Sequence, residues 1–197
     1  MSAPWDDRVC GAPLAGVAWS ERAQPGDGAR VIAPEGAGAW RHMAWPVADG
    51  LFELEPADVG AGALVAGGDA QARSAVAGRL EALGMTVAVE ERLSLDGLRA
   101  ATVVVMLGGE QALPPLTFAP LAARRVVVVP DRARTFGLQP GVELLAGVGH
   151  PELAERANLA VRHLDAFAAM RALGALAAER QRASVLNARL AIDLATF

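Results

Sequence analysis

Two short loops that combine glycine with an acidic residue are the segments of this sequence best suited to hold a ligand. In the first, Gly67 and Gly68 follow an apolar run and precede Asp69, and Arg73 lies one helical turn further on. Glycine lets a ligand approach the backbone, and an arginine near a helix start can pair with a phosphate. We therefore treat Gly67, Gly68 and Arg73 as candidate ligand-binding residues. The favoured alternative is a tight turn in which Asp69 caps the following helix.

The second loop begins with Gly108, Gly109 and Glu110 and ends with two prolines at 114–115. A carboxylate directly after a buried strand can accept hydrogen bonds from sugar hydroxyls, while backbone N–H groups at the next helix hold a phosphate. The alternative is a solvated loop whose prolines start the helix. Gly108, Gly109 and Glu110 are candidate ligand-binding residues on the first interpretation.

Composition excludes several other kinds of chemistry. All 18 basic residues are arginine, and there is no tyrosine, so lysine bases, Schiff bases and tyrosine acids are absent. One cysteine and three histidines give no metal-ligating cluster, and we expect no metal site and no cofactor. A net charge of −4 argues against nucleic acid or anionic membranes as partners. The acidic N-terminus and the lack of a long apolar run predict a cytoplasmic protein with no membrane segment.

Strands and helices alternate along residues 60–197, and this alternation positions both loops. The expected strands are 63–66, 85–89, 102–107 and 125–129. The expected helices are 69–83, 94–99 and a segment after the second loop that ends near Arg124. Such alternation builds βαβ units, and the unbroken apolar run at 102–107 is typical of a strand covered on both faces. We therefore predict an α/β fold with a single doubly wound, Rossmann-like parallel sheet and a C-terminal helical extension.

The two ends of the chain depart from this alternation. Residues 1–59 are rich in proline and glycine, and we expect an N-terminal arm with a short strand at 30–34 and an irregular, aromatic-rich segment at 40–46. The C-terminal third is expected to be helical, with one helix from Pro151 to about 163. A second helix is expected over 166–194, with a kink at Gly174 and an apolar stripe that packs on the core or on a partner.

Three segments share a pattern with one family. The first segment, 113–129, is a polar loop that leads to Phe118, a run of small residues and a valine-rich strand. The second, 65–68, is the end of a strand with a glycine turn, and the third, 104–107, is a strand before a loop. Together they resemble the C-terminal, donor-binding half of GT-B-type glycosyltransferases, especially the CgeB-like group. The resemblance covers about two-thirds of the chain and implies a Rossmann-like domain that binds a nucleotide sugar.

The resemblance is incomplete at the motif itself. The glutamate that the family places after Phe118, which contacts the donor's ribose, is Ala119 here, and Pro120 replaces the usual alanine. Arg124 stands where the family has a small residue before the strand. Glu110 matches the acidic residue that the family carries in its donor loop. A degenerate motif of this kind is typical of a pseudoenzyme.

Two further features of the family bear on activity. Its Arg–Lys pair holds the donor pyrophosphate, and without lysine this pair is incomplete, although Arg73 or Arg132 could take its place. Its active site lies between two Rossmann-like domains, and residues 1–59 are too few to form the acceptor domain. The resemblance thus implies a domain that is not catalytic alone, and that forms a homo-oligomer or binds a partner protein through its C-terminal helices.

A non-catalytic interaction or regulatory module is the alternative function. The same stretch is loosely similar to a response-regulator receiver, with Gly-Gly-Asp after the first strand. Receiver chemistry needs an aspartate at the end of the central strand and a later lysine, and this chain has Met106, Leu107 and Gly108 there and no lysine. It would therefore be a receiver-like scaffold that takes no phosphate.

Overall fold

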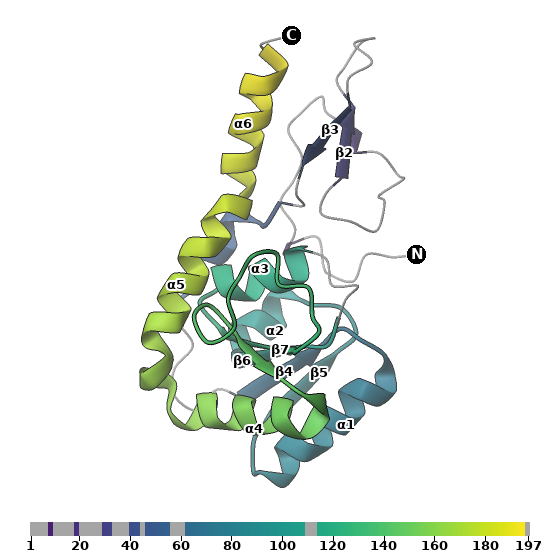
Figure 1. The fold of residues 1–197 in the computed structure, drawn as a ribbon, viewed down its shortest axis with the longest axis vertical. Helices are drawn as coiled ribbons and strands as arrows, with labels where there is room; N and C mark the ends of the chain where they lie inside the picture. Colours follow the sequence, from purple (N-terminus) through teal and green to yellow (C-terminus); the bar gives the residue numbers. More distant parts are fainter. Residues whose placement is uncertain are drawn as a thin grey trace.

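A computed structural model describes residues 8–9, 18–19, 29–32, 40–43, 46–55, 62–108 and 114–195. Its centre is a sheet of five parallel strands in the order β5-β4-β6-β7-β8 (Figure 1). The strands are β4 (Gly62–Ala66), β5 (Val87–Glu90), β6 (Ala101–Met106), β7 (Val126–Pro130) and β8 (Leu145–Gly147). Along the chain this is the order 2-1-3-4-5, a common order of doubly wound sheets. The predicted Rossmann-like α/β fold is confirmed.

Helices cover both faces of the sheet. They are α1 (Ala70–Ala82), α2 (Leu95–Ala100), α3 (Pro114–Ala122), α4 (Gly149–Arg162) and α5 (Ala168–Ala178). Because side chains alternate along a strand, Val65 and Val105 join one core under α1 and α4, whereas Leu64 and Val104 join another under α2 and α3. Helix α5 packs on the outside of α3 (Figure 1).

The starts of the first two helices follow directly from their capping residues. The Asp69 carboxylate accepts a hydrogen bond from the N–H of Ala72 (2.7 Å), and the Ser94 hydroxyl accepts one from the N–H of Gly97 (2.9 Å). Each bond satisfies a backbone donor that the helix itself leaves unpaired. The predicted cap of α1 is therefore confirmed, and Ser94 caps α2 in the same way.

The predicted kink at Gly174 is wrong, and the C-terminal helix is interrupted further on. A Cβ at Gly174 would lie 2.7 Å from Cδ2 of Leu121, so glycine serves the close packing of α5 on α3. A 3-10 turn, η4 (Glu179–Gln181), separates α5 from α6 (Ala183–Ala195). There the Gln181 carbonyl accepts the Val47 N–H (2.7 Å) and the Ala183 N–H donates to the Val47 carbonyl (2.9 Å). These bonds replace helical ones, and α6 then extends beyond the sheet layers (Figure 1).

The N-terminal region contains more regular structure than the sequence indicated. An antiparallel sheet joins β1 (Ala18–Trp19), β2 (Ala29–Ile32) and β3 (Trp40–Met43). Strand β2 matches the strand predicted at 30–34, but β3 lies in the stretch expected to be irregular, and that expectation was wrong. Antiparallel pairing with β2 gives this stretch its hydrogen-bond partners.

Residues 46–55 also pack against the domain and include a short 3-10 helix, η1 (Asp49–Glu53). Val9, Val47 and Leu51 are fully buried in the same core as Leu64. The division into an arm at 1–59 and a domain at 60–197 stays a prediction. None of the described helices combines the length and apolar character that crossing a membrane requires.

Candidate ligand-binding site at the carboxyl edge of the sheet

The two glycine loops of the sequence meet in space. Strands β4 and β6 are neighbours and parallel, with Ala66 paired to Met106, so the segments that follow them leave the sheet side by side. The Leu107 N–H donates to the Ala66 carbonyl (2.8 Å), and a Cβ at Gly67 would lie 3.4 Å from the Gly108 nitrogen. The strand order reverses between β4 and β6, which is the point where open α/β sheets bind their ligands.

The turn after β4 requires glycine at both positions. Gly67 has φ +74° and Gly68 has φ +63°, in the left-handed region that other residues adopt only at a cost. At Gly68 a Cβ would also lie 2.8 Å from the Leu107 Cβ and 3.0 Å from its carbonyl oxygen. The glycines therefore serve a tight turn that packs against the neighbouring loop, and Asp69 caps the helix as the alternative interpretation expected.

Arg73 lies under this turn and is half-buried. Its Nη1 donates to the carbonyl oxygens of Gly68 (2.7 Å) and Gly67 (3.2 Å). Its Nε and Nη2 make no hydrogen bond to any residue that the structure describes. Arg73 thus fixes the turn with one nitrogen and brings a positive charge with further donors to the carboxyl edge of β4.

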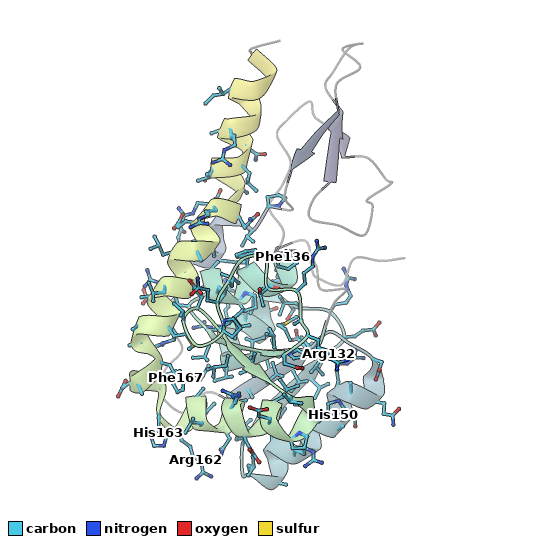
Figure 2. All side chains as sticks on the ribbon, in the orientation of Figure 1. Arg132, Phe136, His150, Arg162, His163 and Phe167 are labelled. Carbon is cyan, nitrogen blue, oxygen red and sulfur yellow. The ribbon has the colours of Figure 1, made fainter. Side chains whose placement is uncertain are left out.

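Arg132 lies on the same edge of the sheet, further from the turn. It follows β7, which is two strands from β4 in the sheet. At the usual strand spacing, about 10 Å separates β7 from β4. Its side chain is exposed, and Figure 2 shows it on the side of His150, at the opposite end of α4 from Arg162 and His163. Gly109 and Glu110 lie outside the described residues, so their position relative to the turn stays a prediction.

Ala119, at the position of the family's donor-binding glutamate, belongs to the interior. Its side chain is fully buried in the core between α3 and the sheet. A residue there contacts core side chains rather than solvent. In addition, no group of three or more His, Cys, Asp or Glu side chains among the described residues is placed to hold a metal ion.

Two arginines lie at the opposite edge of the sheet from the glycine turn. Arg124 and Arg125 precede β7, so they lie at the amino end of that strand. Arg125 is 2% exposed and makes its contacts in the interior. Its Nε donates to the Leu98 carbonyl (2.8 Å) and its Nη1 to the Glu55 carbonyl (3.1 Å). Burial and the nearby charge of Arg171 lower the pKa of Arg125 to about 10.

Comparisons with known proteins do not assign this chain to a family. No model of a known protein family matches the sequence, and a search of curated proteins finds no significant relative. The site itself and the resemblance in the sequence are therefore the grounds for the functional proposal.

Proposed function

We propose that this chain binds a nucleotide or nucleotide sugar at the carboxyl edge of its sheet, as a glycosyltransferase-like domain. The observation that carries the proposal is the contact between the turn of Gly67 and Gly68 and the backbone of Leu107 and Gly108, at the point where the strand order reverses. The sequence pattern of 65–68 and 104–107, which resembles GT-B enzymes, supports the same edge.

Each candidate residue has a distinct part in this proposal. The Nε and Nη2 of Arg73, which bond to no described residue, donate to a phosphate oxygen beside the turn, and the exposed Arg132 offsets further charge of a diphosphate. Glu110 accepts hydrogen bonds from ribose or sugar hydroxyls. Gly67 and Gly68 let the ligand approach the backbone closely.

On this proposal the chain binds its nucleotide ligand but does not by itself transfer a sugar. The carboxylate that the resembled family places after Phe118 is absent, and Ala119 at that position is buried. Sugar transfer would also need an acceptor-binding half, which the described residues do not form. In such a transfer Glu110 orients the donor and the arginines stabilise the leaving diphosphate.

The test is a calorimetric titration with UDP, GDP, ADP and their common sugar conjugates. We expect saturable binding of at least one ligand, weakened about tenfold by Glu110→Ala and by Arg73→Ala, since each loses a charge-assisted contact. Arg79→Ala is the matched control, because Arg79 is exposed on the same helix, away from the turn. No heat at millimolar nucleotide, or equal weakening by Arg79→Ala, would overturn the proposal.

A non-catalytic interaction module is the second candidate, favoured by exposed apolar residues on the C-terminal helices. Leu173, Leu176 and Val185 are 43%, 67% and 39% exposed. Such residues together favour contact with a partner protein or a second copy of the chain. The order 2-1-3-4-5 also occurs in receiver-like domains, although Leu107 stands where a receiver has its aspartate. We expect a dimer in analytical ultracentrifugation that Leu173→Asp dissociates; a monomer at micromolar concentration would contradict this.

A further inference from the structure

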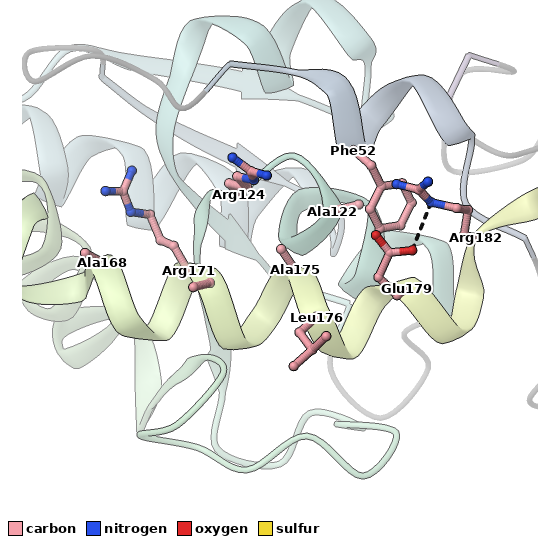
Figure 3. Close-up of a pocket in the computed structure, with 10 residues that line it drawn as sticks. Phe52, Ala122, Arg124, Ala168, Arg171, Ala175, Leu176, Glu179 and Arg182 are labelled. Atoms are coloured by element: carbon pink, nitrogen blue, oxygen red, sulfur yellow. Dashed lines mark ion pairs between the residues drawn. The ribbon is translucent and has the colours of Figure 1, made fainter.

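A cavity of about 550 Å³ lies beside α5, at the opposite edge of the sheet from the glycine turn. Its lining comes from four elements, the end of α3, one side of α5, η4 and η1, and from Arg124 and Arg182, which follow α3 and η4. Figure 3 shows the guanidinium groups of Arg124 and Arg171 toward one end, and Phe52 with the Glu179–Arg182 ion pair at the other. The lining between them is apolar and consists of Ala122, Ala168, Ala172, Ala175 and Leu176.

The positive charges around this cavity are unequally neutralised. Arg182 is paired with Glu179, with 3.0 Å between its Nε and the carboxylate, and its guanidinium lies over the Phe52 ring at 4.1 Å. In contrast, Arg124 and Arg171 form no ion pair with any described residue. The Nε of Arg171 is buried without a hydrogen-bond partner, and so is the Nε of Arg182, whose contact with Glu179 is an ion pair and not a hydrogen bond. A buried N–H group that makes no hydrogen bond costs free energy. The arrangement therefore favours an acceptor that is not one of the described residues.

Arg125 adds a third positive charge behind these two. Burial and the charge of Arg171 together lower its pKa to about 10, so at neutral pH the arginine is charged. The N–H bonds of Arg125 go to the carbonyls of Leu98 and Glu55, which carry no net charge. An anion in the cavity would therefore offset a repulsion that this part of the chain leaves in place.

The backbone at Arg124 is a separate indication that its side chain has a role. The Arg124 N–H donates to the Leu121 carbonyl and the Arg125 N–H to the Pro120 carbonyl, both at 2.9 Å, which closes α3 with a Schellman motif. Arg124 has φ 56°, at the position of this motif where glycine is normally found. A large charged residue in a left-handed conformation points to a function for that residue.

We propose that this cavity binds a phosphate monoester with an apolar body, held by Arg124 and Arg171. A phosphate monoester carries a charge near −2. This matches two guanidinium groups that have no carboxylate partner among the described residues better than the single charge of a carboxylate does. Its oxygens accept the planar, paired donors of arginine. The body of the ligand lies along the alanine lining toward Phe52, and the volume is that of a small-molecule site.

The test is calorimetric titration of the full chain with phenyl phosphate, inorganic phosphate and benzoate. Phenyl phosphate should bind about tenfold more tightly than either of the others, because only it has both the dianion and an apolar body. Arg171→Gln and Arg124→Gly should each weaken it about tenfold. Arg180→Gln is the matched control, since Arg180 is exposed in η4 and does not line the cavity.

Arg124→Gly keeps the test decisive, because glycine suits the backbone there and the variant should fold at least as well as the parent. Lost affinity with an undiminished melting temperature would assign the effect to the guanidinium. The proposal is overturned by absent binding at millimolar phenyl phosphate, by equal affinity for phenyl phosphate and benzoate, or by an equal loss with Arg180→Gln. Because Arg124 and Arg171 lie at the other edge from Gly67 and Arg73, failure here leaves nucleotide binding at the carboxyl edge untouched.

Discussion

At the carboxyl edge of the sheet, Arg73 donates to two carbonyl oxygens of the glycine turn, and Asp69 caps the helix that follows. At the amino edge, Arg124 and Arg171 face a cavity and pair with no carboxylate among the described residues. Arg73 uses its Nη1 to hold the turn at the first edge, whereas the Nε of Arg171 at the second is buried and has no hydrogen-bond partner among the described residues. The difference indicates a preformed turn at one edge and, on our proposal, an anion-binding site at the other.

Arg125 is the sharpest exception to this contrast, because it lies at the amino edge and yet donates to backbone carbonyls as Arg73 does. Arg125→Ala should lower the free energy of unfolding by about 3 kcal/mol, since it leaves a cavity and two unpaired carbonyls. Arg125→Met retains most of the volume and removes a desolvated charge, so its loss should be smaller. Urea denaturation measures both. Equal stability of the alanine variant and the parent would show that Arg125 does not hold the two carbonyls.

At the carboxyl edge the turn itself can be broken at Gly68. Gly68→Ala forces a left-handed alanine against Leu107 and should cost about 2 kcal/mol of stability. Gly78→Ala is the control, because Gly78 lies in α1 with nothing within 4 Å of an added Cβ; there alanine should stabilise the chain by roughly 0.5–1 kcal/mol. Thermal and urea unfolding of the two variants give the comparison. If both alanines stabilise, the close approach of the two loops is wrong.

Arg124→Gly tests the amino edge with a variant that should raise the free energy of unfolding instead of lowering it. Glycine relieves the left-handed backbone at φ 56° and removes one of the clustered charges, so the variant should be more stable by about 1 kcal/mol. Arg124→Ala removes the same charge but keeps the backbone cost, and it should gain less. A more stable alanine than glycine variant would assign the effect to charge alone.

Glu152 gives the smallest expected effect and a pH dependence, and it shows again how the carboxyl edge satisfies its own groups. Its carboxylate accepts the Val148 N–H (2.7 Å) at the start of α4 and pairs with Arg156, and both contacts lower its pKa below the ordinary value. The ionised form therefore stabilises the fold. That contribution is present above the ordinary pKa and is lost as pH falls through the lowered one.

Glu152→Gln should accordingly be slightly less stable than the parent at neutral pH, and the two should converge at acidic pH, below the lowered pKa of Glu152. Denaturation curves at both pH values measure the difference. A difference that is constant from neutral to acidic pH would mean that the charge of Glu152 contributes nothing.

The sequence predicted the elements whose signals are local. The strands predicted at 63–66, 102–107 and 125–129 are β4, β6 and β7, with bounds shifted by at most one residue, and Asp69 and Ser94 cap the helices they precede. These features depend on neighbouring residues only, so periodicity and capping chemistry are sufficient to find them.

Features that depend on distant segments were missed. Strand β8 has three residues and shows no period of its own. The break before α6 exists because Val47 supplies hydrogen bonds from far away in the chain.

Of the two sites, only the glycine loops carried a sequence signal. Parallel pairing of β4 with β6 brings Gly67 and Gly68 beside Leu107 and Gly108, as the general rule for open sheets implies. The cavity at the other edge draws Phe52, Arg124, Arg171 and Arg182 from separate segments, and no spacing in the sequence relates them. What marks the cavity is visible only in the structure, where Arg124 occupies the left-handed position at which glycine normally ends a helix.

The most direct test of the central claim is a two-dimensional amide NMR titration of the chain with UDP. Nucleotide binding at the carboxyl edge predicts that the largest shifts occur at the amides of Gly67, Gly68 and Leu107, and that amides around Arg171 change little. Shifts confined to α5, or no saturable shift at millimolar UDP, would contradict it.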